Sequence, residues 1–282
     1  MNYFYILALL LIGFFVIWPL LEAFRISFTQ WNGYSQDYKY VGLRNYLKLL
    51  TDGNFHIAFR NTLIYGFGSA FLQNVFGLAL AVFLNSKFKG HSVVRTFVYL
   101  PVMISSLLMG YVIYFFVRYN HGVFNELLGA FGVVPVDWMA DGLRGVVIIT
   151  LMNSWQFVGI AMVIYMAGLQ NIPSMYLEAA SIDGANRFQT FFKISLPLLM
   201  PSITSAVVLN VIGGLKLYDV IVSLTSGGPG FTTHSLASYI ANQYFEAQSA
   251  GYSAAVGIFT FLFICIVSNL FTRYFGKKEV EL

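Results

Sequence analysis

Polar side chains interrupt two long apolar stretches of the sequence, and their amide groups can exchange hydrogen bonds with a polar ligand. Asn153 and Gln156 lie in the first stretch and Asn210 in the second. A polar side chain inside a membrane helix is costly unless it faces a cavity or a partner, so such residues are candidate binding sites. Sugars are held by amide and hydroxyl hydrogen bonds beside a flat aromatic face. The candidates for a substrate pathway are Asn153, Gln156, Asn210, Lys216, Tyr218 and Asp219.

Several of these residues also have a purely structural explanation. Lys216 and Asp219 are three residues apart, a spacing at which they can pair with each other near the membrane surface. Trp155 has the amphipathic ring typical of an interfacial anchor. Gln73 and Asn74, in another apolar stretch, are weaker candidates and are better explained as hydrogen-bond donors and acceptors between helices.

A second pattern lies in the polar segment 170–195, which we call the elbow. Its first half predicts a helix, because Pro173 suits a first helical turn and Ala179 and Ala180 are strong helix formers. Gly184 then supplies the left-handed residue that commonly ends a helix.

The second half of the elbow predicts another helix. Asn186 and Gln189 have the spacing of a capping box, and Phe188, Phe191 and Phe192 recur at helical intervals to form one apolar face. Pro197 and Pro201 follow and open the next apolar stretch. Such a helical elbow can lie in a groove of another protein or anchor a loop in lipid headgroups, and the pattern alone favours neither.

Other chemistry is not indicated by the sequence. There is no G-x-x-x-x-G-K-[ST] phosphate-binding loop, so we expect no ATP hydrolysis on this chain. His56, His91, His121 and His234 fall in four separate loops, where we expect solvated side chains and no metal site. Cys265 is the single cysteine and can form no disulfide within the chain.

The composition places the chain in a membrane. Of its 282 residues 58% are hydrophobic and 10% charged, and the mean hydropathy is +0.71. A soluble domain has about 25% charged residues, so the apolar surface here needs lipid. The net charge of +4 does not point to nucleic acid, because basic residues are scattered and never exceed two in a row.

We expect one all-α transmembrane domain over residues 1–282. A membrane helix needs about 20 mostly apolar residues. The first apolar run lacks a basic leading region and a small-x-small cleavage site, so we expect it to remain as a membrane helix. The run 220–245 is uncharged but rich in turn residues, and we exclude it as a span. The six expected spans are about 3–28, 60–86, 94–118, 144–169, 196–222 and 250–274.

The elbow resembles a known family signature. Glu178-Ala179-Ala180, then Gly184 and then Ile194-Ser195-Leu196-Pro197 match the "EAA" loop of the permease subunits of binding-protein-dependent ABC importers. The segments 41–46, 99–101 and 224–229 are similar to the carbohydrate-uptake branch of that family. The resemblance covers roughly residues 15–275 and is nearer to the first maltose-type permease chain than to its partner.

The resemblance implies a mechanism. The EAA loop would be a cytoplasmic coupling helix that docks on a cytosolic ATPase, and closure of the ATPase dimer would rock the membrane helices between inward- and outward-facing states. ATP and Mg²⁺ would be bound by that ATPase, so no cofactor is expected here. The residues that would couple the two proteins are Glu178, Ala179, Ala180, Asp183, Gly184, Phe188 and Phe191.

The resemblance also implies location and partners. A cytoplasmic elbow places both chain termini in the cytoplasm of a bacterium, with the chain crossing the inner membrane; counts of basic residues on the two faces do not decide this. The partners would be a second homologous permease, two cytosolic ATPase subunits, an extracytoplasmic solute-binding protein and membrane lipid, with no nucleic acid.

Three other functions remain open from the sequence. Within the family, the cargo could be a glycerophosphodiester or a sugar phosphate, with Lys216 as an anion contact. Outside it, an intramembrane enzyme would need paired catalytic residues at one depth, which we do not find. A stand-alone secondary transporter would usually show an internal repeat and membrane acids for ion coupling, a role that only Asp219 could fill.

Overall fold

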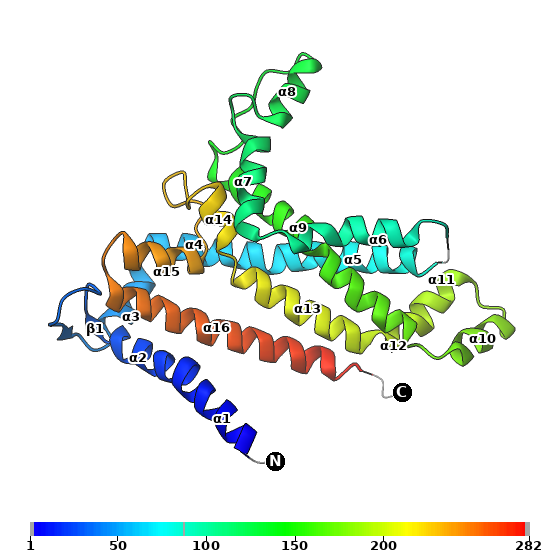
Figure 1. The fold of residues 1–282 in the computed structure, drawn as a ribbon, viewed down its shortest axis with the longest axis horizontal. Coiled ribbons are helices and arrows are strands. Elements are labelled where there is room, and N and C mark those ends of the chain that lie inside the picture. Colours follow the sequence, from blue (N-terminus) through cyan, green and yellow to red (C-terminus); the bar gives the residue numbers. More distant parts are fainter. Residues whose placement is uncertain (1–2, 87, 280–282) are drawn as a thin grey trace.

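The computed structural model describes residues 3–86 and 88–279 and is almost wholly helical. Long helices lie side by side along the longest axis of the molecule (Figure 1). The elbow lies at one end of this bundle and a small β-hairpin at the other, and we call these the elbow end and the hairpin end. Helix α1 begins, and α16 ends, toward the elbow end (Figure 1).

The first span is one long rod whose first half is exposed and whose second half packs against the last span. It comprises α1 (Tyr3–Ile12), a π-helical turn η1 (Gly13–Ile17) and α2 (Trp18–Ser27). A hairpin of strands β1 (Thr29–Gln30) and β2 (Lys39–Tyr40) follows, and then α3 (Arg44–Thr51). The hairpin is antiparallel, with Thr29 opposite Tyr40.

The second and fourth spans form the centre of the bundle. The second consists of α4 (Gly53–Leu63), the π-helical turn η2 (Ile64–Gly68) and α5 (Ser69–Asn85), and the fourth is the continuous helix α9 (Gly142–Gln170). Gly77 of α5 allows a very close approach, because a Cβ there would lie 2.6 Å from Ala161 of α9. These two helices pack along their length more extensively than any other pair in the described chain.

The third span is broken, contrary to the single helix expected at 94–118. Helix α6 (His91–Tyr99) continues as the 3₁₀ turn η3 (Leu100–Met103), and α7 (Ser106–Val117) then departs at 100°. Pro101 has no backbone N–H for the helical ladder, and Ile104 and Ser105 are not helical. Helix α7 and the short α8 (Val123–Ala130) project away from the bundle (Figure 1).

The expected span 196–222 is likewise not one helix. The elbow helices α10 (Ser174–Ile182) and α11 (Arg187–Thr190) lead through the π-helical turn η4 (Phe191–Ser195) into α12 (Leu196–Leu198). A 68° bend at Leu199 separates this run from α13 (Met200–Leu215). Pro201 explains the bend, since it cannot donate to the carbonyl of residue 197. The chain leaves helical geometry again at Lys216.

The last part of the chain turns back on itself. Helix α14 (Asp219–Leu224) packs against α7, and a loop of residues 225–235 leads to α15 (Leu236–Phe245) and the final span α16 (Ala250–Gly276). The run 220–245 is thus two short helices and a loop. Four helices in the described chain are long and apolar enough to cross a membrane, and six spans result if each bent pair is one.

Candidate functional site

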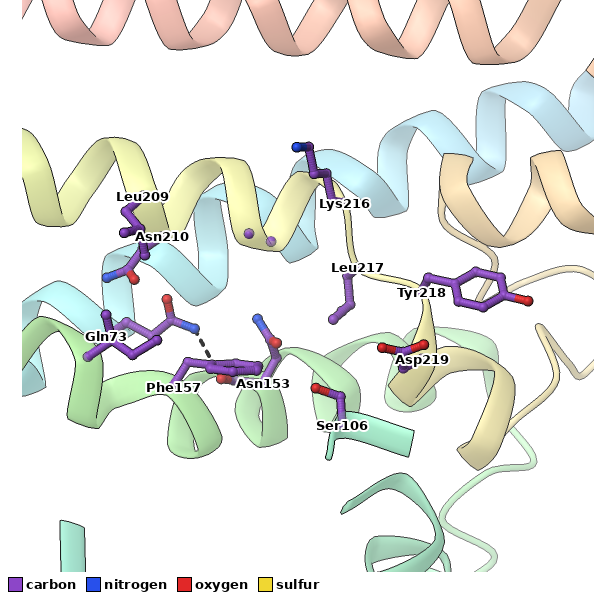
Figure 2. Close-up of a pocket in the computed structure, with 13 residues that line it drawn as sticks. Gln73, Ser106, Asn153, Phe157, Leu209, Asn210, Lys216, Leu217, Tyr218 and Asp219 are labelled. Carbon is purple, nitrogen blue, oxygen red and sulfur yellow. Dashed lines mark hydrogen bonds between the residues drawn. The ribbon is translucent and has the colours of Figure 1, made fainter. Parts of the chain in front are cut away.

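A cavity of about 220 Å³ lies where α5, α9 and α13 meet the end of the broken span (Figure 2). Gln73 comes from α5, Asn153 from α9 and Asn210 from α13, and their side chains converge on it. Phe157, one helical turn after Asn153, gives the cavity an aromatic wall. The full lining is Gln73, Ser106, Asn153, Phe157, Ile160, Leu209, Asn210, Gly213, Gly214, Lys216, Leu217, Tyr218 and Asp219.

Five of the six pathway candidates line this cavity, and one does not. The five are Asn153, Asn210, Lys216, Tyr218 and Asp219. Gln156 is fully buried elsewhere, and its Nε2 donates to the carbonyl of Ile104 at 3.0 Å. Ile104 lies at the bend between η3 and α7, so Gln156 holds the break of the third span. Gln156 does not line this cavity, and its role as a pathway residue stays a prediction.

Gln73 was ranked too low by sequence reasoning. Its Nε2 donates to the backbone carbonyl of Asn153 at 3.0 Å, which is the helix-to-helix bond expected of it, and the same side chain also lines the cavity. Asn74 has only the structural role. Its Nδ2 donates to the carbonyl of Ala70, and its Oδ1 accepts from the hydroxyl of Tyr165. Phe157 was missed, although its four-residue spacing from Asn153 on one helix face was a usable signal.

Asn210 carries an unpaired donor beside the cavity. Its side chain lines the cavity and is buried, and its Nδ2 atom is enclosed by protein with no hydrogen-bond partner in the described structure. A buried amide without a partner costs about 1–3 kcal/mol, so a rotation of this amide toward a ligand that accepts the hydrogen bond would be favoured. Asn153 differs, because its Nδ2 already donates to Ser69 Oγ at 2.9 Å.

Lys216 and Asp219 do not pair with each other. Among the described residues Arg25 and Glu22 form an ion pair, and His121 and Glu126 are hydrogen-bonded at 3.1 Å. Both Lys216 and Asp219 are exposed at the rim of the cavity, in the non-helical link after α13 and at the start of α14. The cavity therefore has amides inside and one charge of each sign at its edge.

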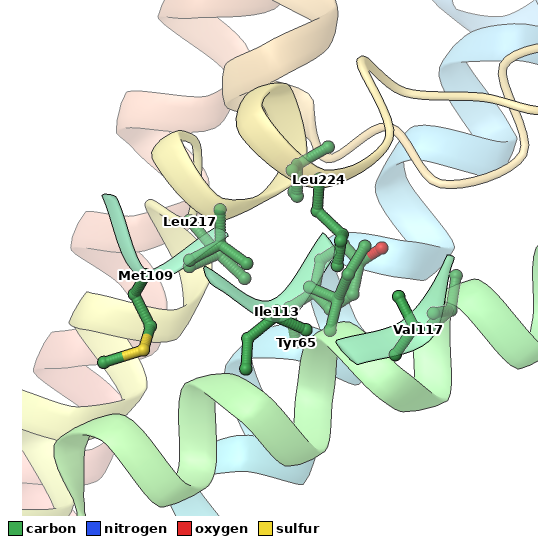
Figure 3. Packing of buried hydrophobic residues seen from close by; sticks show 10 residues of the cluster. Tyr65, Met109, Ile113, Val117, Leu217 and Leu224 are labelled. Carbon is green, nitrogen blue, oxygen red and sulfur yellow. The ribbon is translucent and has the colours of Figure 1, made fainter. Parts of the chain in front are cut away.

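An apolar cluster backs the cavity on the α7 and α14 side (Figure 3). Leu217 belongs to both, since it lines the cavity and packs in the cluster. Tyr65 from η2 and Met109 and Ile113 from α7 fill the space between helices. This packing fixes where the link at residues 216–219 can lie.

The elbow projects from the bundle with little covering it. Glu178, Ala179 and Asp183 are exposed on α10, Ala180 is buried, and Glu178 has no hydrogen bond or ion pair with any described residue. Large apolar side chains are also exposed, among them Ile182 at 86% and Phe188 at 71%. Phe191 is half-buried, so the three phenylalanines do not share one covered face.

The turn between the elbow helices is built as the sequence predicted. Gly184 has φ +74°, and the bonds from Gly184 N to Ser181 O (3.2 Å) and from Ala185 N to Ala180 O (2.9 Å) form a Schellman motif. Asn186 and Gln189 make both bonds of the capping box, each 2.9 Å long. A rigid turn therefore separates α10 from α11.

Both ends of the elbow attach where α9 and α13 pack against each other. It leaves from α9 and returns through Leu199 to α13, and Leu199 is fully buried. A Cβ on Gly168 of α9 would lie 2.2 Å from Ser202 Oγ and 2.8 Å from Leu199 Cδ1. The two helices are therefore in close contact where the elbow begins and ends.

One of the four histidines departs from the expected solvated state. His234 is buried, its Nδ1 is 2.9 Å from Ser238 Oγ, and its ring occupies the space where a Cβ on Gly227 would be. Burial lowers the pKa of His234 below its ordinary value. No group of three His, Cys, Asp or Glu side chains within residues 3–86 and 88–279 is placed to hold a metal ion.

Comparison with known proteins assigns the family. Residues 73–280 match the family described as "Binding-protein-dependent transport system inner membrane component". The chain belongs to this family. It is 34% identical to the trehalose/maltose transport system permease protein MalF of Thermococcus litoralis, covering 94% of this chain and 90% of the relative. It is also 34% identical to the multiple sugar-binding transport system permease protein MsmF of Streptococcus mutans, over 98% and 95%.

The fold of this permease agrees with the assignment. It superposes with a TM-score of 0.82 on a chain of a bacterial alginate ABC transporter in complex with an alginate pentasaccharide-bound periplasmic protein. The identity is 22%, and the match covers 95% of this chain and 91% of the other. The chain is thus an all-α, multi-pass inner-membrane permease subunit. The alternatives of an intramembrane enzyme and a stand-alone secondary transporter are not supported.

Proposed function

We propose that this permease forms half of the passage through which an ATP-driven importer takes up a sugar or oligosaccharide. Two relatives above 30% identity are named as permeases of sugar transport systems, and the fold resembles that of a chain from an alginate ABC transporter. The cavity supplies what a sugar needs, namely the amides of Asn153 and Asn210 and the ring of Phe157. The convergence of these amides and this ring on one cavity is the observation that carries the assignment.

Coupling to a cytosolic ATPase is assigned to the elbow. Its exposed apolar side chains and the unengaged carboxylate of Glu178 suit a groove with a basic or hydroxyl group. Ala179 and Asp183 lie on the exposed surface of the same helix, and Gly184 sets the angle between α10 and α11. ATP and Mg²⁺ would then be bound by the ATPase, and this chain would carry no cofactor.

Sidedness follows from this assignment. The elbow end is cytoplasmic, both termini lie on that side, and the hairpin end meets a solute-binding protein outside. A second homologous permease closes the cavity laterally, two ATPase subunits bind the pair, and lipid covers the remaining apolar surface.

A charged cargo such as a sugar phosphate or a glycerophosphodiester fits less well. Lys216 at the cavity rim could hold an anion, but Asp219 lies at the same rim and would repel it. The two relatives are named for sugars and not for phosphate esters. We therefore assign the cavity to hydroxyl-rich sugars or oligosaccharides.

Charge reversal at Glu178 tests the coupling role. The permease carries an affinity tag and is expressed with its partner subunits, and co-purified ATPase and ATP-driven sugar uptake are measured. Glu178→Arg is expected to lower both at least about tenfold, the loss of a charged contact of roughly 1.4 kcal/mol. Glu279→Arg changes another exposed acid, just after α16 toward the elbow end, and is expected to change neither. Full ATPase recovery and uptake in Glu178→Arg would overturn the assignment.

A further inference from the structure

A chain of hydrogen bonds leads from the cavity into the second span. Asn153 of α9 donates through Nδ2 to Ser69 Oγ of α5 at 2.9 Å, and Ser69 Oγ donates to the backbone carbonyl of Tyr65. Tyr65 lies in the π-helical turn η2, and its hydroxyl donates to the carbonyl of Thr233 at 2.8 Å. Ser69 and Tyr65 are fully buried, so water does not compete for these bonds.

The direction of each bond in this chain is determined. A serine hydroxyl has one proton, and that of Ser69 is used on Tyr65. Ser69 can therefore only accept from its neighbour across the helix interface. The amide of Asn153 must turn its nitrogen toward Ser69, and its oxygen is the atom left for the cavity that Asn153 lines.

The surroundings prevent Ser69 from moving. A Cβ on Gly214 of α13 would lie 2.9 Å from Ser69 Oγ and 2.7 Å from the Tyr65 carbonyl, so α13 closes over both atoms. Gln73 fixes Asn153 from the other direction by donating to its backbone carbonyl. Asn153 is thus held through its side chain and its backbone by two residues of α5.

We propose that Ser69 is a positioning residue that sets the hydrogen-bonding polarity of the cavity. With its nitrogen occupied, Asn153 offers the ligand an acceptor. A ligand group that meets the Asn153 side chain must therefore donate a hydrogen bond to it. A sugar hydroxyl can donate, whereas a fully ionised phosphate oxygen only accepts. This inference rests on the proposed sugar-import function and specifies how the cavity selects its ligand.

The test compares sugars with analogues that each lack one hydroxyl. The permease is reconstituted into vesicles with its own partner subunits, and uptake of maltose, trehalose and their mono-deoxy analogues is measured. The quantity of interest is the uptake efficiency of the parent sugar divided by that of the analogue. The same binding protein is used throughout, so a change in this ratio belongs to the permease.

Ser69→Ala is expected to lower this ratio by about three- to tenfold for at least one analogue, because the freed Asn153 amide can present nitrogen or oxygen. The half-saturating sugar concentration should rise more than the maximal rate falls. Ser69→Thr keeps the hydroxyl and is expected to restore the ratio. Ser154→Ala is the matched control, since Ser154 is a buried helix serine that bonds its own helix through Thr150.

A second comparison separates positioning from a general structural effect. If Ser69 acts through Asn153, Ser69→Ala has no further effect on the ratio in an Asn153→Ala background. An unchanged ratio in Ser69→Ala, or independent effects of the two substitutions, would overturn the inference while wild-type uptake upholds the sugar function. Failure of the wild-type complex to take up any of these sugars would instead overturn the proposed function, and this inference with it.

Discussion

At the scale of single residues, three amides in neighbouring spans have three different roles because their partners differ. Gln156 holds the carbonyl at the bend of the third span, Asn153 is oriented by Ser69, and Asn210 has a buried donor without a partner beside the cavity. All three are amide side chains inside long apolar stretches of the sequence. The local hydrogen-bond partners, which come from other spans, decide which of them can meet a ligand.

A single carboxylate joins three helices at the hairpin end. Asp52 caps α4 by accepting from Asn54 N at 3.0 Å, and its other oxygen accepts from Tyr239 of α15 at 2.7 Å and Tyr252 of α16 at 2.6 Å. Burial alone would raise the pKa of Asp52, but the hydroxyl and amide donors, with Phe55 N among them, together hold it below its ordinary value of 3.8.

Asp52→Asn is expected to destabilise the permease by about 1–3 kcal/mol, because the amide can cap the helix but cannot accept from both tyrosines. Lowering the pH should also destabilise the wild-type permease. Since the pKa of Asp52 is lower in the folded chain, its stabilisation is present above about pH 4 and is lost as pH falls through the folded value. Thermal unfolding in nanodiscs between about pH 7 and 3 measures both effects.

Asp141→Asn is the control for this prediction. Asp141 also caps a helix, accepting from Leu143 N at 3.0 Å, and the structure gives its carboxylate no tyrosine donor. Asp141→Asn is expected to lower the free energy of unfolding by less than Asp52→Asn does, and to leave the dependence of stability on acid pH unchanged. Equal losses in the two variants would show that Asp52 is only a cap.

At the scale of elements, the function lies where helices break. The bend after η3 places Ser106 at the cavity, and the end of α13 places Lys216 and Asp219 there. Broken spans leave backbone groups without helical partners, and protein groups must satisfy them inside a membrane. Gln156 does so for Ile104, and Ser235 does so by donating to the carbonyl of Leu217 at 2.6 Å.

The contact between α9 and α13 at the base of the elbow should tolerate no side chain. Gly168→Ala is expected to cost about 1–3 kcal/mol by overpacking against Leu199 and Ser202, and to weaken ATP-driven uptake. Gly257→Ala is the matched control in α16, where a Cβ meets nothing within 4 Å. It should be neutral or stabilising by up to about 1 kcal/mol, because alanine favours helix. Unfolding measurements on both variants check this, and equal stabilities would contradict it.

Sequence reasoning predicted local features well and long-range ones poorly. The stop at Gly184 and the capping box at Asn186 depend on neighbours within five residues, and both are present. The breaks inside the expected spans 94–118 and 196–222 were missed, because hydropathy averages over a bend. The burial of His234 and the location of Gln156 depend on residues of other helices, which no local pattern contains.

At the scale of the whole molecule, the elbow and the cavity belong to one packed unit. Helices α5, α9 and α13 carry Gln73, Asn153 and Asn210. The elbow connects the end of α9 to the start of α13. Close contacts at Gly77 and Gly168 leave little room for these helices to slide past one another. A force applied to the elbow would therefore move the amide wall of the cavity as a body.

The most direct test of this account is sided sugar uptake in vesicles that hold the permease with its own partner subunits. Labelled maltose or trehalose is offered with the solute-binding protein on the hairpin side, and ATP is supplied on one side at a time. The account predicts accumulation only when ATP is on the elbow side, and at least about tenfold less of it when the elbow carries Glu178→Arg. Accumulation without ATP, or with ATP on the hairpin side alone, would contradict it.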